Sequence, residues 1–323
     1  MTVALAVLVV LSLAFAWSMG AHYTGAVMGM PYASKSIRMW PALVSLSFLT
    51  ILGAAFASHG VQQTVGLRIV DAGRITAPML IIVELGAFFL TTVYTYAKVP
   101  TSTIQILVFC VVGTALAAGV PVQWQTIAVL VVTWVLAPPV AALLGFGCTK
   151  LLDAIVPEAR KPVAGQPLVV LPRLLVLVGL GAAFVLGAND VSNAVGVWSS
   201  IHLGTLFIAG LAGGVAMAVG ALTWGQRILN RVAFDIVKVD LAMASAAQFV
   251  QALVVFIAVS LGLFTSMNQA LVGAMFGTGL ARGRETVQTA TLLGILKGWA
   301  ISPITGGTLC YMLERILLAL GGR

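Results

Sequence analysis

The sequence contains very little charge. Only 8% of its 323 residues are Asp, Glu, Lys or Arg, whereas 60% are hydrophobic, and the mean hydropathy is +1.09. A water-exposed globular surface needs far more charge than this, which excludes a soluble fold. Apolar stretches of about the length that crosses a bilayer recur along the chain, separated by short polar segments. We therefore expect an all-α polytopic protein that passes several times through the cell (inner) membrane, with the lipid bilayer as a partner.

The chain is also poor in the residues that build metal and catalytic centres. An intramembrane enzyme would need a nucleophile and a base, or a metal set, at suitable spacing. We find no such spacing, so we expect no enzyme and no cofactor other than a coupling ion. A receptor is equally disfavoured, because no extramembrane segment has a useful size. The cysteines and histidines that lack the spacing of a metal or catalytic site are Cys110, Cys148, Cys310, His22, His59 and His202.

Acidic residues are scarcer than basic ones, which gives a net charge of +8. In a soluble protein this balance would suggest nucleic acid as a partner. Here the basic residues lie mainly between the apolar stretches, where Lys and Arg contact anionic lipid. We therefore expect no nucleic-acid partner.

The second half of the sequence repeats the first. Sliding the chain against itself aligns Thr101–Gly119 with Thr265–Gly283, with ten identities in nineteen positions that include Thr, Ser and Gln. We expect a first transmembrane repeat over residues 1–149, a hydrophilic linker over 150–170 and a second repeat over 171–323. Internal repeats are typical of secondary transporters, whose substrate site lies near the midplane between the copies. An odd number of spans in each copy would make the two repeats inverted.

A polar cluster follows one apolar stretch of the second copy, in the segment Gly187–Gly196 (GANDVSNAVG). An ionised Asp at membrane depth is costly unless it faces a cation, a partner or water. Carboxylate and amide oxygens suit hard cations such as Na⁺. We therefore predict that the helix breaks at the flanking glycines and that Asn189 and Asp190 form a coupling-ion site, with Asp190 as the candidate Na⁺ ligand. The alternative is an ordinary helix start capped by one of these side chains.

Two further polar clusters align with each other in the two copies. Each follows one apolar stretch and precedes a shorter one that contains Gly, a pattern typical of a re-entrant helical hairpin. Hydroxyl groups beside the free N–H groups of a helix start would cradle an anion, although a simple N-cap is the alternative. The predicted substrate-binding residues are Thr101, Ser102, Thr103, Gln105, Asn193, Thr265, Ser266, Asn268 and Gln269.

Other ionisable side chains also lie within or beside apolar sequence. Glu84 is a further candidate for binding a coupling cation or proton, whereas Lys297 could equally reach the membrane interface. Near the front of the first copy, His22 and Tyr23 occupy the places that an Asn-Asp pair has in the second. The two copies therefore differ chemically. His22 titrates near neutral pH when free, but a hydrogen-bonded structural histidine is the alternative.

These residues resemble the inorganic phosphate transporter (PiT) family, whose hallmark is a Gly-Ala-Asn-Asp-Val-x-Asn-Ala motif. Gly187–Ala194 matches the motif closely, and Ala221–Gly225 and Thr265–Ala274 resemble later parts of the family's second half. The resemblance implies two inverted repeats, cation-driven symport and inorganic phosphate as the substrate. It places Asn189, Asp190 and Asn193 at the cation and substrate site, with Thr265 and Ser266 against the anion.

The first copy departs from the family pattern at the motif, where His22 and Tyr23 replace the usual Asn-Asp pair. Asn268 stands where the family's second hairpin has a histidine. Sequences with such losses look like the family's sulfate-permease branch, so sulfate is the alternative substrate and the coupling ion is Na⁺ or H⁺. Hydrogen phosphate donates and accepts hydrogen bonds, whereas sulfate only accepts, so the missing acidic acceptor leans toward sulfate.

A passive anion channel is a less favoured alternative, because such a channel gains nothing from a buried carboxylate. The expected partners are therefore inorganic phosphate or sulfate, the lipid bilayer and, as a homodimer, a second copy of the chain.

Overall fold

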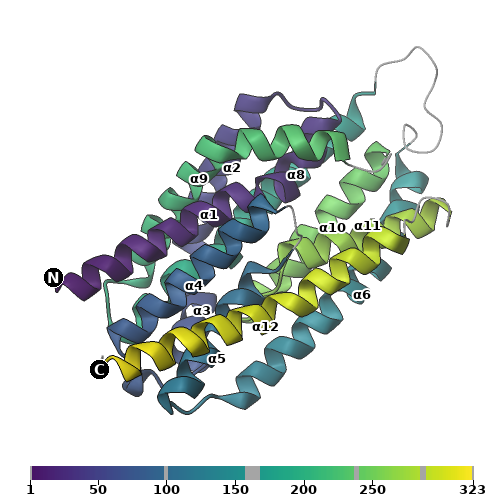
Figure 1. Ribbon diagram of the computed structural model, residues 1–323. Helices are drawn as coiled ribbons and strands as arrows, with labels where there is room; N and C mark the ends of the chain where they lie inside the picture. Colours follow the sequence, from purple (N-terminus) through teal and green to yellow (C-terminus); the bar gives the residue numbers. More distant parts are fainter. Residues whose placement is uncertain (1, 98–100, 157–167, 236–239, 284–288, 322–323) are drawn as a thin grey trace.

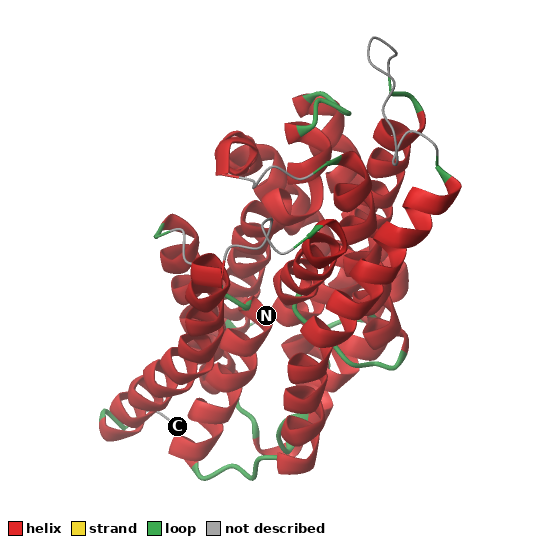
Figure 2. Cartoon of the chain, turned by 90° about the vertical axis from the view of Figure 1, so that its right-hand side faces the viewer, coloured by secondary structure: helices red, strands yellow, loops and turns green. Residues whose placement is uncertain are grey.

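The computed structural model describes residues 2–97, 101–156, 168–235, 240–283 and 289–321, and these form a helical bundle (Figures 1 and 2). Within them no β-strand forms apart from one isolated bridge between Val70 and Val122. The helices of the first half are α1 (Val3–Ala33), α2 (Met39–Ala57), α3 (His59–Gln63), the π-helical turn η1 (Thr64–Arg68), the 3-10 turn η2 (Ala72–Arg74), α4 (Ala77–Tyr96), α5 (Thr103–Ala118) and α6 (Trp124–Ile155). Those of the second half are α8 (Val170–Val195), the 3-10 turn η3 (Gly196–Ile201), α9 (Leu206–Asp235), α10 (Leu241–Ser260), α11 (Met267–Arg282) and α12 (Thr289–Ala319).

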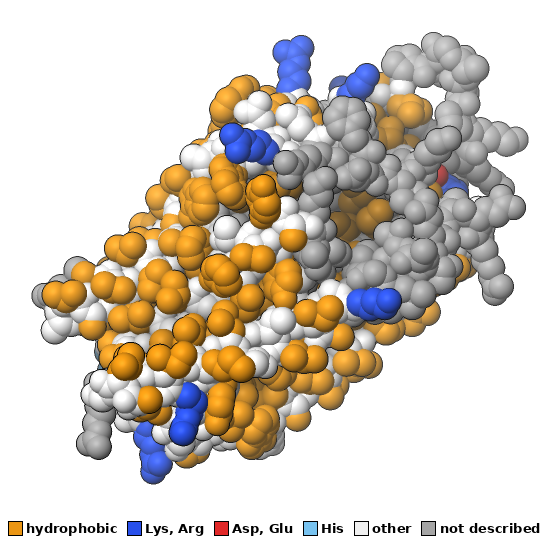
Figure 3. Space-filling view, in the orientation of Figure 1, with side chains coloured by type: hydrophobic (Ala, Val, Ile, Leu, Met, Phe, Trp, Pro, Cys, Tyr) orange, Lys and Arg blue, Asp and Glu red, His pale blue; other side chains and the backbone are white. Residues whose placement is uncertain are grey.

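Seven helical segments in the described residues are long and apolar enough to cross a bilayer, namely those of α1, α2, α4, α6, α8, α9 and α10. Their outward faces carry large apolar side chains such as Leu143, which is 75% exposed. Figure 3 shows one face covered by hydrophobic side chains, with the visible Lys and Arg mainly toward its ends. The protein is therefore a multi-pass membrane protein, as its composition predicts.

Helices α5 and α11 are shorter, with 16 residues each. At a rise of 1.5 Å per residue each extends about 24 Å, which is less than the roughly 30 Å of the hydrocarbon core. Each follows a longer apolar helix, α4 or α10, and the polar clusters lie at the junctions. The short second arms fit the predicted re-entrant hairpins. The first arms, α4 and α10, have 20 residues each and are long enough to cross the bilayer, so the re-entrant course of the chain stays a prediction.

The helices of the second half repeat those of the first in the register seen in the sequence. Helices α4 and α10 begin at equivalent positions (77 and 241) and end at equivalent positions (96 and 260), with the offset that pairs Thr101 with Thr265. Helices α5 and α11 keep the same offset at both ends (103 and 267; 118 and 282). The starts of α1 and α8 (3 and 170) and of α2 and α9 (39 and 206) share the offset that pairs Gly20 with Gly187. The internal repeat is thus present in the helices as well as in the residues.

Equivalent helices of the two halves make exchanged contacts. Helix α1 packs on α9 so closely that a β-carbon at Gly20 would overlap the carbonyl oxygen of Met217. Helix α8 packs on α2 in the same way, with Gly187 against the carbonyl of Thr50. The two glycines are equivalent in the repeat, and so are Thr50 and Met217, so the two contacts are copies of one another.

A second pair of glycines shows the same exchange. Gly53 of α2 faces the carbonyl of Phe184 in α8, and Gly220 of α9 faces the carbonyl of Trp17 in α1. Each residue of the first contact is again equivalent to one of the second. The two halves are therefore joined by close backbone contacts that both copies provide.

The ends of the chain lie near the same end of the bundle in Figure 1, where α1 begins and α12 finishes, as inverted copies require. The predicted linker over 150–170 lies partly outside the described residues: α6 continues to Ile155 and α8 begins at Val170. The division into two repeat domains and their inverted orientation stay predictions.

Candidate functional site

The polar motif of the second copy lies within a continuous helix. Helix α8 runs to Val195 and contains Asn189, Asp190, Ser192 and Asn193, all of them fully buried. The predicted break in the helix at the flanking glycines is therefore wrong, since only a 3-10 turn follows at Gly196. Partners from other helices reach these side chains, so their polar groups do not need unwound backbone.

The side chain of Asn189 joins the motif to the chain segment ahead of α11. Its Nδ2 donates to Asp190 Oδ2 at 2.9 Å and to the Thr265 carbonyl oxygen at 2.8 Å, and its Oδ1 accepts from the Thr265 backbone N–H at 3.2 Å. Both polar backbone groups of Thr265 are thereby satisfied by one amide. The motif thus positions the start of the second predicted hairpin.

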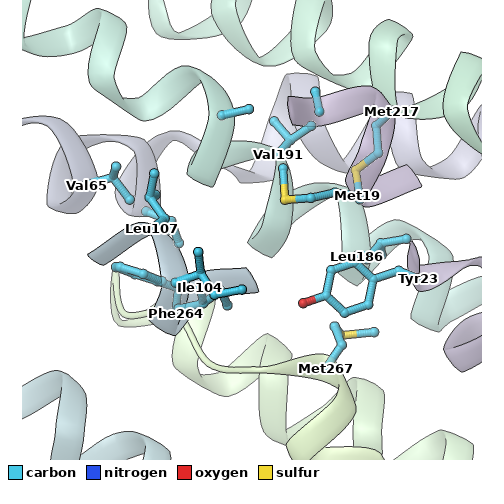
Figure 4. Packing of buried hydrophobic residues seen from close by; sticks show 14 of the residues in the cluster. Met19, Tyr23, Val65, Ile104, Leu107, Leu186, Val191, Met217, Phe264 and Met267 are labelled. Atoms are coloured by element: carbon cyan, nitrogen blue, oxygen red, sulfur yellow. The ribbon is translucent and has the colours of Figure 1, made fainter. Parts of the chain in front are cut away.

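The second oxygen of Asp190, Oδ1, is buried and has no hydrogen-bond partner among the residues that the structure describes. The carboxylate also interacts with the hydroxyl of Tyr23, which in turn lies 2.8 Å from Thr103 Oγ1. Figure 4 shows the ring of Tyr23 with its hydroxyl pointing toward the segment between Phe264 and Met267. Tyr23 therefore connects Asp190 of the second copy with the start of α5 in the first.

Serine caps the start of both short helices. Ser102 Oγ accepts from the Gln105 N–H at 3.3 Å, and Ser266 Oγ accepts from the Gln269 N–H at 3.4 Å, with both serines fully buried. The N-cap interpretation is thus correct as to local geometry, but these caps are buried in protein rather than placed at a lipid interface. A buried helix N-terminus with free N–H groups and positive potential binds anions readily.

Several polar groups beside these caps have no partner in the described part of the chain. The hydroxyls of Thr101 and Thr265, which are equivalent in the two copies, are buried and unpaired, as is Asn193 Oδ1. The Nδ2 of Asn193 makes only a 3.8 Å contact with the sulfur of Met19. Unpaired hydroxyls and amides around two helix N-termini can together bind a small polar ligand.

The corresponding position of the first copy holds His22. Its Nδ1 lies 2.7 Å from Thr95 Oγ1 and its Nε2 lies 3.1 Å from Asn268 Nδ2. Asn268 Nδ2 also donates to the Thr101 carbonyl oxygen at 3.3 Å. His22 therefore lies at the start of α5 as Asn189 lies at the start of α11, with Thr101 equivalent to Thr265.

Two buried glutamines of α10 also position this region and were not predicted from the sequence. Gln251 Nε2 donates to the Met267 carbonyl oxygen at 3.2 Å, and Gln248 Nε2 donates to Gln251 Oε1 at 2.6 Å. The signal that could have found them is the pair of uncharged polar residues three positions apart inside an apolar span.

Gln105 and Gln269, both predicted to bind substrate, lie behind the serine caps and line a cavity of about 1140 Å³ bounded by α5, α6, α11 and α12. Their Oε1 atoms have no partner among the described residues. The other walls are mostly apolar, with Trp134 and Trp299 among them. The glutamines therefore face this cavity as well as the helix starts.

Glu84 lies apart from these contacts. It is fully buried in α4, both of its carboxylate oxygens lack a hydrogen-bond partner in the described part of the chain, and its electrostatic neighbour is Cys110 of α5. In the repeat register of α4 and α10 it aligns with Gln248, which has a partner. Lys297 is exposed on α12, so it is not a buried charge.

In the described residues, no group of three or more His, Cys, Asp or Glu side chains is arranged to hold a metal ion. The polar groups that converge are mainly hydroxyls, amides and helix N–H groups with a single carboxylate, Asp190. Such a set can bind an oxyanion through its donors, and a monovalent cation or proton through its oxygens.

The chain matches the sequence profile of the Phosphate transporter family twice, over residues 19–172 and 167–310. It is 25% identical to a predicted phosphate permease of Pyrococcus abyssi, with 97% of each chain covered. It is 26% identical to the sulfate permease CysP of Bacillus subtilis, with 96% of this chain and 87% of CysP covered. A solved structure titled the sodium-dependent phosphate transporter has a TM-score of 0.89 at 24% identity, with 98% of this chain and 100% of that chain covered.

Proposed function

Since the chain belongs to the phosphate transporter family, we propose that it carries inorganic phosphate across the cell membrane by cation-coupled symport. The family consists of transporters, so the protein is a multi-pass transporter and not an enzyme. The substrate, its coupling and the residues that bind both are the proposal developed below.

The observation that carries this proposal is the pair of buried, serine-capped helix starts at Ser102 and Ser266. Each presents backbone N–H groups, and each is preceded by a threonine whose buried hydroxyl has no partner among the described residues. A tetrahedral oxyanion has enough oxygens to accept from both starts at once. A site made from equivalent parts of two repeats also fits the general position of transporter sites.

We assign the anion contacts to Thr101, Ser102, Thr265, Ser266 and Asn193. Their hydroxyl and amide groups are fully buried, so a bound anion would be separated from lipid. The buried hydroxyls of Thr101 and Thr265, unpaired among the described residues, cost free energy on the order of 1–3 kcal/mol each, which an anion would recover on binding. Asn193 would donate through its Nδ2, because its unpaired Oδ1 can only accept. Thr103, Asn268, Gln105 and Gln269 complete the proposed set from positions beside the caps.

Coupling is assigned to Asp190 and Asn189. The Oδ1 of Asp190 is a buried acceptor without a partner among the described residues, and the Asp190 carboxylate is linked to the proposed anion region through Tyr23 and Thr103. A cation or proton at this carboxylate would offset the charge of the anion nearby, so the two would bind with positive cooperativity. That cooperativity is what symport requires.

Sulfate is the second candidate substrate, favoured by one observation. Tyr23 occupies the first-copy position equivalent to Asp190, so a hydroxyl donor replaces an acidic acceptor there. Fully ionised sulfate needs donors only, whereas hydrogen phosphate also needs an acceptor. A relative that covers nearly the whole chain is named as a sulfate permease.

Uptake into proteoliposomes of the purified protein tests the proposal. Radiolabelled phosphate and sulfate are offered separately, each with an imposed Na⁺ gradient, an imposed proton gradient or no gradient. We expect phosphate to accumulate above its external concentration only when a cation gradient is present. Accumulation of sulfate but not phosphate would make sulfate the substrate. Equilibration that no cation gradient raises above the external concentration would indicate a channel.

A further inference from the structure

The hydrogen bonds around His22 define which of its nitrogens carries a proton. Thr95 Oγ1 donates its own hydrogen to the Thr91 carbonyl oxygen at 2.7 Å, so toward His22 it can only accept. His22 Nδ1 must therefore be the N–H that donates to Thr95. This fixes the side of the ring that faces α4.

The opposite nitrogen, Nε2, faces the amide nitrogen of Asn268 at 3.1 Å. An amide nitrogen donates and does not accept, so Nε2 must hold a lone pair. Rotating the amide by half a turn would bring Asn268 Oδ1 against the Thr101 carbonyl oxygen, which now accepts from Nδ2 at 3.3 Å. The network is therefore complete only when His22 is neutral.

The Thr101 carbonyl oxygen also faces the imidazole of His22. A proton added to Nε2 would be repelled by the Asn268 amide hydrogens and attracted by this carbonyl. The protonated ring would then donate to the Thr101 carbonyl oxygen in place of Asn268. The Asn268 amide would lose both of its acceptors, this carbonyl oxygen and His22 Nε2. Asn268 belongs to α11 and Thr101 precedes α5, so this exchange would loosen a contact between the two helix starts.

We propose that His22 carries the coupling proton, and that its protonation releases Asn268 from Thr101 so that the freed amide can donate to the anion. The inference rests on the proposed symport, takes a proton as the coupling ion and adds His22 to the coupling site proposed at Asp190, to which the ring of Tyr23 links it. The imidazolium adds a positive charge beside the anion region, so proton and anion bind together. After release of the anion the proton leaves Nε2 to water, and the Asn268 contact forms again.

Few ionisable groups compete for this proton in the described residues. The ring of Tyr23 lies edge-on to that of His22, with centroids 5.0 Å apart, and the Tyr23 hydroxyl interacts with Asp190. The contacts from α4, α11 and the start of α5 are made by uncharged groups. The other charged side chains on helices that pack against α1 lie far along those helices from this network. Each is ten or more positions, about 15 Å of helix, from the residue of its own helix that makes a contact described above or, on α9, from Met217, which faces Gly20. These side chains are Glu84 on α4, Arg173 on α8, Arg227 on α9 and Arg282 on α11.

Proteoliposomes without Na⁺ test the inference with two variants and one matched control. His22→Gln keeps a hydrogen-bonding side chain that cannot be protonated, and His59→Gln removes a part-buried histidine that belongs to α3, outside the network. We expect His22→Gln to lower proton-driven accumulation at least tenfold while phosphate-for-phosphate exchange continues, because exchange needs no net proton movement. His59→Gln should retain both activities. Proton-driven accumulation unchanged in His22→Gln would overturn the inference.

Asn268→Ala provides a second readout if His22→Gln does not fold. This variant keeps the histidine but removes both the group that favours its neutral form and a donor to the anion, so uptake should need more substrate, while the uptake that remains should stay proton-driven with its pH dependence shifted toward higher pH. Sulfate is the second substrate for this profile, because its charge does not change over the range. An unshifted profile would overturn the inference. Wild-type accumulation driven by Na⁺ alone would overturn only the inference, whereas no accumulation of either anion under any gradient would overturn the proposed symport itself.

Discussion

Tyr23 and Asp190 occupy equivalent positions of the two repeats, and their side chains interact with each other at the centre of the protein. The phenol hydroxyl thus lies against the carboxylate that aligns with it. Two identical acidic residues could not share this contact without a cation between them, because like charges 4 Å apart repel by about 4 kcal/mol at an effective dielectric of about 20. With Tyr23 in the place of the second carboxylate, the contact brings a hydroxyl donor to Asp190 and creates no such repulsion.

Restoring the acidic residue should therefore restore a need for a cation. We expect Tyr23→Asp to make phosphate uptake depend on Na⁺, because the second carboxylate would need a cation to lie beside Asp190. Uptake would be measured in matched Na⁺ and K⁺ buffers. Tyr23→Phe is the control, since it removes the hydroxyl and adds no charge, and it should show no new Na⁺ dependence. Equal uptake by Tyr23→Asp in both salts would contradict the explanation.

Removing the charge of Asp190 should abolish accumulation while leaving the protein folded. Asp190→Asn keeps the shape of the side chain and an oxygen for Asn189 Nδ2, so the packing of α8 should survive. It removes the anionic oxygen at which we place the coupling charge, so uptake should no longer exceed equilibration. Asp71→Asn, at an acidic loop residue whose side chain is 45% exposed, should behave as wild type. Full accumulation by Asp190→Asn would remove this residue from the coupling site.

Glu84 tests the other acidic residue that the sequence suggests for coupling. Glu84→Gln introduces the residue that the second copy has at the equivalent position 248. Because the Glu84 oxygens have no partner among the described residues and no contact there joins them to Asp190, we expect accumulation to be retained and thermal stability to be equal or higher. Loss of accumulation in a folded Glu84→Gln protein would instead support the sequence-based assignment.

The sequence predicted the membrane helices and the repeat well, because both are local or periodic properties. Runs of apolar residues locate the spans, and identities such as Gln105 with Gln269 align the copies. The helix break at the motif was predicted wrongly for a tertiary reason. Asn189 is satisfied by the backbone of Thr265, far away in the chain, and no pattern around Asn189 indicates that partner.

The contacts of the candidate site were harder to predict for the same reason. His22 could be recognised as the counterpart of Asn189, but its pairing with Asn268 depends on how α1 and α11 pack. Gln248 and Gln251 are not predicted from the sequence because they carry no charge and belong to no polar cluster. Burial, rather than spacing, distinguishes them.

The serine caps allow the anion role to be separated from the structural role. Ser266→Ala removes the hydroxyl, and a lost cap costs about 1 kcal/mol, so we expect lower stability and a several-fold higher half-saturating phosphate concentration. Ser266→Asp keeps an oxygen that can cap Gln269 but places a negative charge where we place the anion. An ionised Asp is costly at this buried position, so the melting temperature should fall below that of wild type, and uptake should be lost in the protein that still folds. Normal uptake by Ser266→Asp would leave Ser266 with capping alone.

Two glycines of α8 make opposite predictions about packing. A β-carbon at Gly187 would overlap the carbonyl oxygen of Thr50 and approach the backbone nitrogen of Ala54, so α8 and α2 would have to separate. Because both obstructing atoms belong to the backbone, they cannot rotate away. We expect Gly187→Ala to lower the free energy of unfolding by about 1–3 kcal/mol or more, the usual cost of forcing atoms into a packed interior.

Gly181 is the matched control, since it lies in the same helix, is exposed and has open space at its β-position. Gly181→Ala should be neutral or stabilising, because Ala favours the helix over Gly by up to about 1 kcal/mol. Melting temperatures of the purified variants in detergent measure the difference. The α1 equivalent, Gly20→Ala, should resemble Gly187→Ala because its contact with Met217 is the copy of the contact between Gly187 and Thr50. Equal stability of Gly187→Ala and Gly181→Ala would mean that the exchanged contact between the repeats is looser than the structure shows.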